Sequence, residues 1–122
     1  MARILIVDDS PTETYKFREI LERNGHQVLE AGNGADGVAV ARQEKPDVVL
    51  MDVVMPGLNG FQATRQLTKA PDTAHIPVII VTTKDQETDR VWGKRQGARD
   101  YLTKPVDEAM LLDVIRRALA GT

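Results

Sequence analysis

The stretch VVLMDVVMPG, residues 48–57, places the carboxylate of Asp52 directly after four consecutive apolar residues. A short apolar run of this kind is typical of a strand that is buried on both faces of a parallel sheet. Pro56 and Gly57 then turn the chain. In open parallel sheets, ligands and chemistry collect at the carboxyl ends of the strands. Asp52 is therefore the first candidate for a functional residue.

Strands and helices are predicted to alternate on both sides of this stretch. Runs of strand length occur at residues 3–7, 27–31, 48–51, 77–81 and 99–102. Helical segments are expected over residues 11–24, 35–44, 60–68, 86–96 and from about 107 onward. The strand at 27–31 has polar residues at both ends, which indicates an edge position in the sheet.

Polar residues that can cap helices precede several of these segments. Ser10-Pro11-Thr12-Glu13 has the pattern of a capping box with proline in the first turn. Asn59 and Asp85 are the expected caps of the helices that follow them. Regular alternation with short connections predicts an α/β fold, a doubly wound (βα)5 parallel sheet with helices on both faces. We expect one domain over residues 1–122, because no linker, repeat or low-complexity segment interrupts the pattern.

The composition excludes several classes of function. The chain has 122 residues, a formal net charge of −2 and a pI near 5.7, so it lacks the basic character of nucleic-acid-binding proteins and polybasic membrane anchors. It contains no cysteine, which excludes disulfides, thiolate metal sites and thiol catalysis. No segment resembles a signal peptide or a spanning helix, so we expect a cytoplasmic protein with protein or small-ligand partners.

Charged or hydroxyl side chains follow four of the predicted strands: Asp8 and Asp9, Asp52, Thr82, and Lys104. A parallel sheet brings these strand ends to one edge. Two carboxylates ~4 Å apart repel by about 4 kcal/mol at an effective dielectric constant of 20, so a cation is expected to offset the acids. All-oxygen ligation suits Mg²⁺, and Lys104 adds a second positive centre. A phosphoryl group bound between the two would allow Asp52 to act as the nucleophile and form an acyl phosphate.

Taken one at a time, these residues have ordinary explanations. Asp9 could supplement Ser10 at the start of the first helix, and Lys104 before Pro105 could be an exposed lysine. The combination is harder to explain in this way, because the buried strands end in groups that suit the same chemistry.

The sequence resembles a response-regulator receiver domain, of the CheY-like family, over essentially its whole length. The motifs that carry the resemblance are Val7-Asp8-Asp9-Ser10, Leu50-Met51-Asp52 with Met55-Pro56-Gly57 and Gly60, Val81-Thr82, and Tyr101-Leu102-Thr103-Lys104-Pro105. The resemblance implies a flavodoxin-like fold with strand order 2-1-3-4-5. It also implies a phosphorylation-dependent switch of a two-component or chemosensory system, rather than an enzyme that turns over an external substrate.

The resemblance also implies a role for each residue of the site. Asp52 would be the phosphoacceptor, and Lys104 would contact the phosphoryl group. Asp8, Asp9, Asp52 and the backbone carbonyl of Val54 would hold Mg²⁺.

Thr82, Tyr101 and Pro105 are the switch residues that the resemblance implies. Thr82 would bond a phosphoryl oxygen and draw its loop inward, which lets Tyr101 exchange an outward for an inward rotamer. The Lys104-Pro105 bond is expected to be cis. The changed surface of the fourth helix, fifth strand and fifth helix would then bind a downstream protein. We expect Trp92, on the fourth helix, to pack against the domain rather than to anchor a partner.

Residues 84–93 and 95–101 resemble the stand-alone receivers of type IV pilus chemosensory systems, of the PilH type. This likeness implies a role in twitching motility and a CheA-like histidine kinase as the phosphoryl donor. A monomer is expected, because no appended output domain demands a dimer. Val54 and Lys84 stand at the two positions that tune phosphoryl lifetime in this family, so the lifetime of CheY is not transferable. The fourth helix is also more basic than that of CheY, with Arg90, Lys94 and Arg95.

Two other classes of protein share parts of the pattern. Residues 32–37, Gly-Asn-Gly-Ala-Asp-Gly, match the G-x-G-x-x-G of dinucleotide-binding oxidoreductases, and Asp52 follows Gly32 by twenty residues. The strand before this motif is short and edge-like, however, and five strands leave no substrate domain. An aspartate-nucleophile phosphatase also uses Asp, Lys and Mg²⁺, but it needs a second Asp two residues after the nucleophile, where this chain has Val54.

Overall fold

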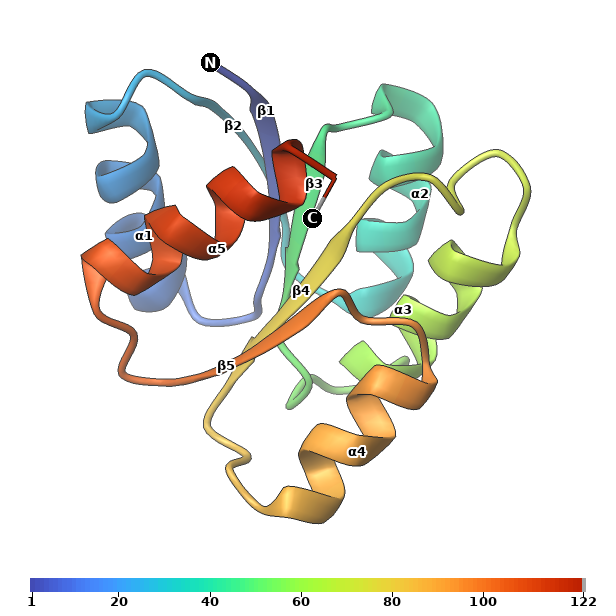
Figure 1. Ribbon diagram of the computed structural model, residues 1–122. Helices are drawn as coiled ribbons and strands as arrows, with labels where there is room; N and C mark the ends of the chain where they lie inside the picture. Colours follow the sequence, from blue (N-terminus) through green and yellow to red (C-terminus); the bar gives the residue numbers. More distant parts are fainter. Residues whose placement is uncertain (122) are drawn as a thin grey trace.

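The computed structural model describes residues 1–121, which form a parallel sheet of five strands with a helix after each strand (Figure 1). The strands are β1 (Arg3–Val7), β2 (Gln27–Ala31), β3 (Val48–Met51), β4 (Val78–Thr82) and β5 (Asp100–Thr103). The helices are α1 (Pro11–Arg23), α2 (Gly34–Glu44), α3 (Gly60–Lys69), α4 (Glu87–Arg95) and α5 (Glu108–Leu119). The predicted alternation is confirmed, and Thr122 lies outside the described residues.

The strands follow the order β2-β1-β3-β4-β5, and every neighbouring pair is parallel. This confirms the predicted flavodoxin-like fold and the edge position of β2. Helices α1 and α5 cover one face of the sheet, and α2, α3 and α4 cover the other (Figure 1). The carboxyl ends of all five strands therefore lie along one edge of the sheet.

The central strands are apolar throughout because both of their faces are covered. On β1, Ile4 and Ile6 pack in the cluster that includes α1 and α5, whereas Leu5 and Val7 pack in the cluster that includes α2 and α3. All four are at most 1% exposed. Burial of each such side chain stabilises the fold by about 1.5–3 kcal/mol. The residues that directly follow these strands are therefore attached to a rigid part of the fold.

The predicted helix caps have different outcomes. Ser10 accepts a hydrogen bond from the Glu13 backbone N–H at 3.3 Å, as predicted, but the Glu13 side chain faces Lys104 instead of completing a capping box. Asn59 forms a full capping box with Gln62. The predicted cap at Asp85 is wrong, because α4 begins at Glu87 with Gln86 as its N-cap residue.

Contacts of Lys84 account for the late start of α4. The Lys84 carbonyl accepts a hydrogen bond from the Tyr101 hydroxyl at 2.8 Å, and the Lys84 N–H faces the Thr82 hydroxyl at 3.4 Å. Both contacts hold the segment before α4 in a non-helical path. Tertiary contacts thus override the local capping preference of Asp85. Within residues 1–121, no helix has the length and apolar character needed to cross a membrane.

Candidate functional site

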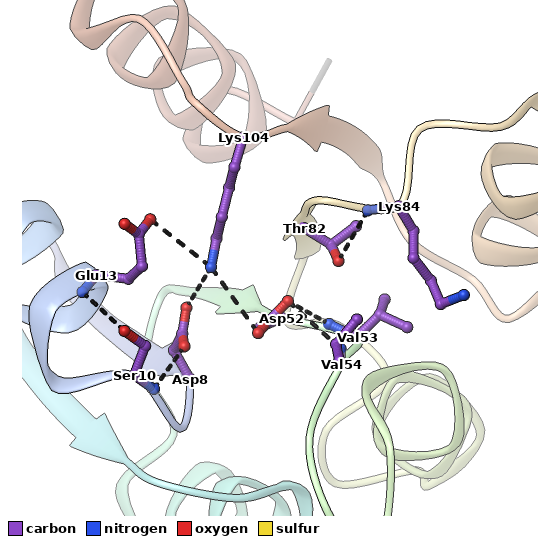
Figure 2. A network of polar contacts seen from close by, with 9 residues as sticks. All are labelled: Asp8, Ser10, Glu13, Asp52, Val53, Val54, Thr82, Lys84 and Lys104. Atoms are coloured by element: carbon purple, nitrogen blue, oxygen red, sulfur yellow. Dashed lines mark hydrogen bonds and ion pairs between the residues drawn. The ribbon is translucent and has the colours of Figure 1, made fainter.

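Strand register brings the predicted site residues together at one edge of the sheet. Val7 of β1 pairs with Met51 of β3, so Asp8 and Asp52 leave adjacent strands at the same level. Thr82 of β4 pairs with Thr103 of β5, which places Lys104 beside the end of β4. Figure 2 shows the side chains of Asp8, Asp52, Thr82 and Lys104 converging from these strand ends.

Lys104 is held by three carboxylates. Its Nζ donates a hydrogen bond to Asp8 Oδ2 at 2.7 Å and lies 3.8 Å from Asp52 Oδ2. It also lies 3.7 Å from Glu13 Oε1 (Figure 2). The Lys104 side chain is only 10% exposed, which weakens screening of these pairs by solvent. Lys104 is therefore fixed next to the candidate nucleophile, and the possibility that it is an ordinary surface lysine is wrong.

Asp8, Asp9 and Asp52 form an acidic cluster that suits a hard cation. One carboxylate oxygen of each lies within 4.8 Å of the others, and this is the one group of at least three possible metal ligands found among residues 1–121. Asp8 and Asp52 are buried, whereas Asp9 is exposed. An all-carboxylate donor set with an open side matches the preference of Mg²⁺ for oxygen ligands and retained water.

The two carboxylate oxygens of Asp52 have different surroundings. Oδ1 accepts a hydrogen bond from the Val53 backbone N–H at 2.8 Å and a longer one from the Val54 N–H at 3.4 Å. Oδ2 faces Lys104. Burial raises the pKa of the Asp52 carboxyl above its usual range; the ammonium of Lys104 opposes this shift, and the charge of Asp8 adds to it. The backbone thus orients the carboxylate while its environment raises its basicity.

Gly60 leaves the space that the backbone of Asp52 occupies. A β-carbon on Gly60 would lie 2.0 Å from the Asp52 carbonyl oxygen, far inside contact distance. The Gly60 N–H also donates to the Val53 carbonyl at 3.1 Å. The start of α3 therefore packs directly against the chain that carries the candidate nucleophile, which explains why this position has no side chain.

The cluster opens into a cleft of about 470 Å³. Its lining includes Asp52, Val54 and Lys104, together with Glu13 and Lys16 from α1. Sequence reasoning did not find Glu13 or Lys16 as site residues. A signal was available, because α1 begins directly after Asp8 and Asp9, so its first turn necessarily borders the same strand end.

Thr82 connects the acidic cluster to Tyr101. Thr82 is fully buried, and its hydroxyl lowers the pKa of the nearby Asp52 carboxyl. The same hydroxyl accepts from the Lys84 N–H at 3.4 Å, and the Lys84 carbonyl accepts from the Tyr101 hydroxyl at 2.8 Å. Tyr101 is 4% exposed, and its burial is the main cause that raises the pKa of its phenol to about 12. The structure therefore holds the inward rotamer of Tyr101.

Arg90 of α4 lies against the same tyrosine. Its guanidinium carbon is 5.2 Å from the centre of the Tyr101 ring, in reach of a cation–π interaction. Its nitrogens donate to the Tyr101 carbonyl at 3.3 Å and to the Thr103 hydroxyl at 2.6 Å. The sequence indicated only that α4 has a basic face; the structure shows that Arg90 fastens α4 to β5, one residue before Lys104.

The interpretation of Trp92 as a packing residue is wrong. Trp92 is 50% exposed and Val91 beside it is 48% exposed. Gly93 occupies the inward position next to them, where a β-carbon would meet Ile80 and Tyr101 at 2.9 Å. Because the inward position of α4 accepts no side chain, its apolar residues lie on the outer surface.

The Lys104-Pro105 peptide bond is cis, as expected.

Two of the three glycines of the G-x-G-x-x-G pattern, Gly34 and Gly37, have packing roles. A β-carbon on Gly34 would lie 2.2 Å from the Leu58 carbonyl oxygen, and one on Gly37 would lie 2.8 Å from the Val7 side chain. Both glycines let α2 approach its neighbours closely. The motif follows the edge strand β2 rather than a central strand. These observations count against the dinucleotide-binding alternative.

A sheet of this order with this cluster of residues defines a class of signalling protein. Residues 4–116 match the response regulator receiver domain family, and the chain belongs to that family. It is 79% identical over 121 residues to Protein PilH of Pseudomonas aeruginosa, a match that covers 99% of this chain and 100% of that protein. It is 41% identical over 115 residues to the response regulator PleD of Caulobacter vibrioides, covering 94% of this chain but 25% of PleD.

Solved receiver structures superimpose closely. The chemotaxis protein CheY4 of Vibrio cholerae has a TM-score of 0.91 at 30% identity, and the match covers 98% of this chain and 99% of that one. The receiver domain of the sensor histidine kinase PA1611 from Pseudomonas aeruginosa has a TM-score of 0.90 at 29% identity and covers 98% of both chains. The PA1611 structure has a magnesium ion coordinated in its active-site cleft. The recognised CheY-like family is confirmed.

Proposed function

We propose that this protein is a phosphorylation-controlled switch that accepts a phosphoryl group from a histidine kinase on Asp52. The observation that carries this proposal is the geometry around Asp52 Oδ2. This oxygen lies 3.8 Å from Lys104 Nζ, inside a cluster whose three carboxylates come within 4.8 Å of one another. No metabolic substrate is needed to explain the cluster, because the acceptor is part of the chain itself.

In the proposed reaction, a carboxylate oxygen of Asp52 attacks the phosphorus atom of the donor phosphohistidine. The new oxygen–phosphorus bond forms as the nitrogen–phosphorus bond breaks, and the electron pair of the broken bond stays on the imidazole. Asp8, Asp9, Asp52 and the carbonyl of Val54 would hold Mg²⁺, which would neutralise charge on the phosphoryl oxygens. Lys104 would donate to a phosphoryl oxygen from the opposite side.

The phosphoryl group would then be detected by the hydroxyl of Thr82. Thr82 would turn toward it and draw the segment of Lys84 inward, which changes the surroundings of Tyr101 and the surface of α4, β5 and α5. Tyr101 and Pro105 would act as switch residues in this response. A downstream protein would bind that surface in one state of the switch, which is a population shift biased by the phosphoryl group.

The similarity to PilH supports a narrower role. Because the match extends over all of that protein at 79% identity, we propose that this receiver acts in a type IV pilus chemosensory system. It would be cytoplasmic and monomeric, would receive its phosphoryl group from a CheA-like histidine kinase and would influence twitching motility. Loss of the phosphoryl group by autodephosphorylation would reset the switch.

Incubation with acetyl phosphate and Mg²⁺, followed by intact mass spectrometry, tests the central step. We expect the mass of one phosphoryl group, prevented by EDTA and absent in Asp52→Asn. Asp100→Asn, which removes an acid at the opposite end of β5, is the matched control and should still be modified. Modification that persists in Asp52→Asn would show that another residue is the acceptor.

A further inference from the structure

One carboxylate that the proposed reaction does not use lies beside the reactive lysine. Glu13 stands in the first turn of α1, and its Oε1 lies 3.7 Å from Lys104 Nζ, almost the same distance as the 3.8 Å to Asp52 Oδ2. Figure 2 shows Glu13 and Asp52 on opposite sides of the ammonium group. Lys104 therefore sits between the acceptor and an acid that is not part of the three-carboxylate cluster.

Local structure fixes Glu13 in this position. Its backbone N–H is bound by the Ser10 hydroxyl at the start of α1, at 3.3 Å. Its carboxylate is turned toward Lys104 and not back to the N-cap residue. The Glu13 side chain is 29% exposed and that of Lys104 is 10% exposed, so the pair is partly shielded from water. An ion pair in such surroundings is stronger than one on the open surface.

We propose that Glu13 is a positioning residue that competes with the phosphoryl group for Lys104, so that it limits how tightly the site holds a phosphoryl group. This inference rests on the proposed function of Asp52. A phosphoryl group adds roughly two negative charges, and Lys104 must shift its contact toward them. Glu13 offers the ammonium a second partner on the far side and adds a negative charge that repels the phosphoryl oxygens.

Competition between Glu13 and the phosphoryl group for Lys104 predicts changes in affinity that a purely structural role of Glu13 does not. Removing the charge of Glu13 makes the site less negative, which weakens binding of a cation and strengthens binding of an anion. Damage to the fold at α1 would weaken both. Opposite changes in the affinities for Mg²⁺ and for a phosphoryl mimic therefore identify an electrostatic effect at Lys104.

The test compares wild type with Glu13→Gln and with Glu19→Gln. Glu19 lies on the same helix, is exposed and accepts a weak hydrogen bond from the Tyr15 hydroxyl at 3.4 Å, so its substitution removes the same charge away from the cleft. Beryllofluoride serves as the phosphoryl mimic, titrated at saturating Mg²⁺ and followed by fluorine NMR. We expect beryllofluoride to bind about fivefold more tightly to Glu13→Gln. Calorimetry should show Mg²⁺ binding about twofold more weakly to this variant, and Glu19→Gln should change neither affinity.

The outcomes separate this inference from the function on which it rests. Unchanged or weaker beryllofluoride binding by Glu13→Gln would overturn the competition, and so would an equal gain in Glu19→Gln, because any charge on α1 would then suffice. Failure of the wild-type protein to bind beryllofluoride on Asp52 would instead contradict the proposed function.

Discussion

Asp52 has a charged side and a neutral side. On the α1 side, Lys104 makes ionic contacts with carboxylates at 2.7–3.8 Å. On the α4 side, Thr82, Lys84 and Tyr101 are connected by hydrogen bonds of 3.4 Å and 2.8 Å between hydroxyl and backbone groups. The proposed reaction and its proposed detection would therefore depend on different kinds of interaction. Fixed charges surround the candidate acceptor, whereas the hydrogen bonds from Thr82 to Tyr101 join neutral groups, with the charged Arg90 against the Tyr101 ring.

The two sides also differ in what supports them. The charged side is supported by β1, β3, the first turn of α1 and the end of β5, which Lys104 directly follows. The residues at the ends of β1 and β3 are almost fully excluded from solvent. The neutral side includes residues 83–86, all of which are exposed and none of which belongs to a helix or strand. Segments with little buried apolar area open at lower free energy than core elements. Motion is therefore expected on the α4 side, while the α1 side keeps its geometry.

The largest expected effect comes from a substitution that disturbs the charged side and the neutral side of Asp52 together. Gly60→Ala places a β-carbon 2.0 Å from the Asp52 carbonyl oxygen, so the backbone of the acceptor must move. We expect the free energy of unfolding to fall by about 4 kcal/mol, because the contact is with backbone that cannot rotate away. Urea denaturation followed by circular dichroism measures this loss.

Gly32→Ala is the matched control for this prediction. Gly32 also lies near the carboxyl edge, but a β-carbon there meets nothing within 4 Å. Its substitution should change the free energy of unfolding by less than about 0.5 kcal/mol. Equal stability of the two alanine variants would show that the start of α3 does not pack against Asp52 in solution.

The next largest effect on the free energy of unfolding is expected to differ between the charged side and the neutral side of Asp52. Lys104→Met leaves the buried carboxylate of Asp8 without its cation, whereas the Ser10 N–H, at 2.9 Å, still donates to it. We expect the free energy of unfolding in EDTA to fall by about 2 kcal/mol. Thr82→Ala, on the neutral side, should cost about 1 kcal/mol under the same conditions. Lys104→Met should also bind Mg²⁺ more tightly, because the ammonium no longer competes for Asp8.

Urea titrations in EDTA and in Mg²⁺ measure both effects. Mg²⁺ should restore more stability to Lys104→Met than to Thr82→Ala, because a bound cation replaces the lost charge. Equal stability of Lys104→Met and Thr82→Ala in EDTA would contradict this prediction. It would show that the buried carboxylates near Asp52 do not need the ammonium of Lys104.

The fold and the convergence of Asp8, Asp52 and Lys104 could be predicted because both depend on strand ends. Apolar runs fix which strands are buried, and a parallel sheet then places Asp8, Asp52 and Lys104 at one edge whatever their side chains do. The contacts of Glu13 and Arg90 could not be predicted in this way. Both depend on which rotamer a long side chain adopts on a helix surface, and several rotamers are compatible with the same sequence pattern.

The wrong predictions for Asp85 and Trp92 have a related physical cause. Asp85 is a good helix cap in isolation, but hydrogen bonds from β4 and β5 to Lys84 set the path of the chain before α4. Trp92 looks like a core residue, but Gly93 takes the inward position beside Tyr101. In both cases a contact with a distant strand decides the outcome. Local preference and composition cannot report such contacts.

The smallest expected effect concerns the titration of Tyr101. Burial raises the pKa of Tyr101 to about 12, so in Tyr15→Phe, where Tyr101 is the one remaining tyrosine, the ultraviolet titration should have its midpoint near that value. The folded state holds the phenolic proton more tightly than the unfolded state does, where the pKa is about 10. The free energy of unfolding should therefore decrease as pH rises from about 10 to 12, and additional substitution of Tyr101 by Phe should remove this decrease.

A midpoint near 10 would instead show that the ring is exposed in solution. With the raised pKa, the phenol of Tyr101 stays neutral across the physiological range and can donate to the Lys84 carbonyl throughout it, so the proposed response of the neutral side would not depend on pH. The charged side differs, because burial also raises the pKa of the Asp52 carboxyl and only its ionised form can attack phosphorus. In EDTA, where no metal stabilises the carboxylate, the titration of Asp52 followed by carbon-13 NMR should therefore have its midpoint above that of an ordinary aspartate. The pH dependence of the switch is thus expected to arise from the α1 side alone.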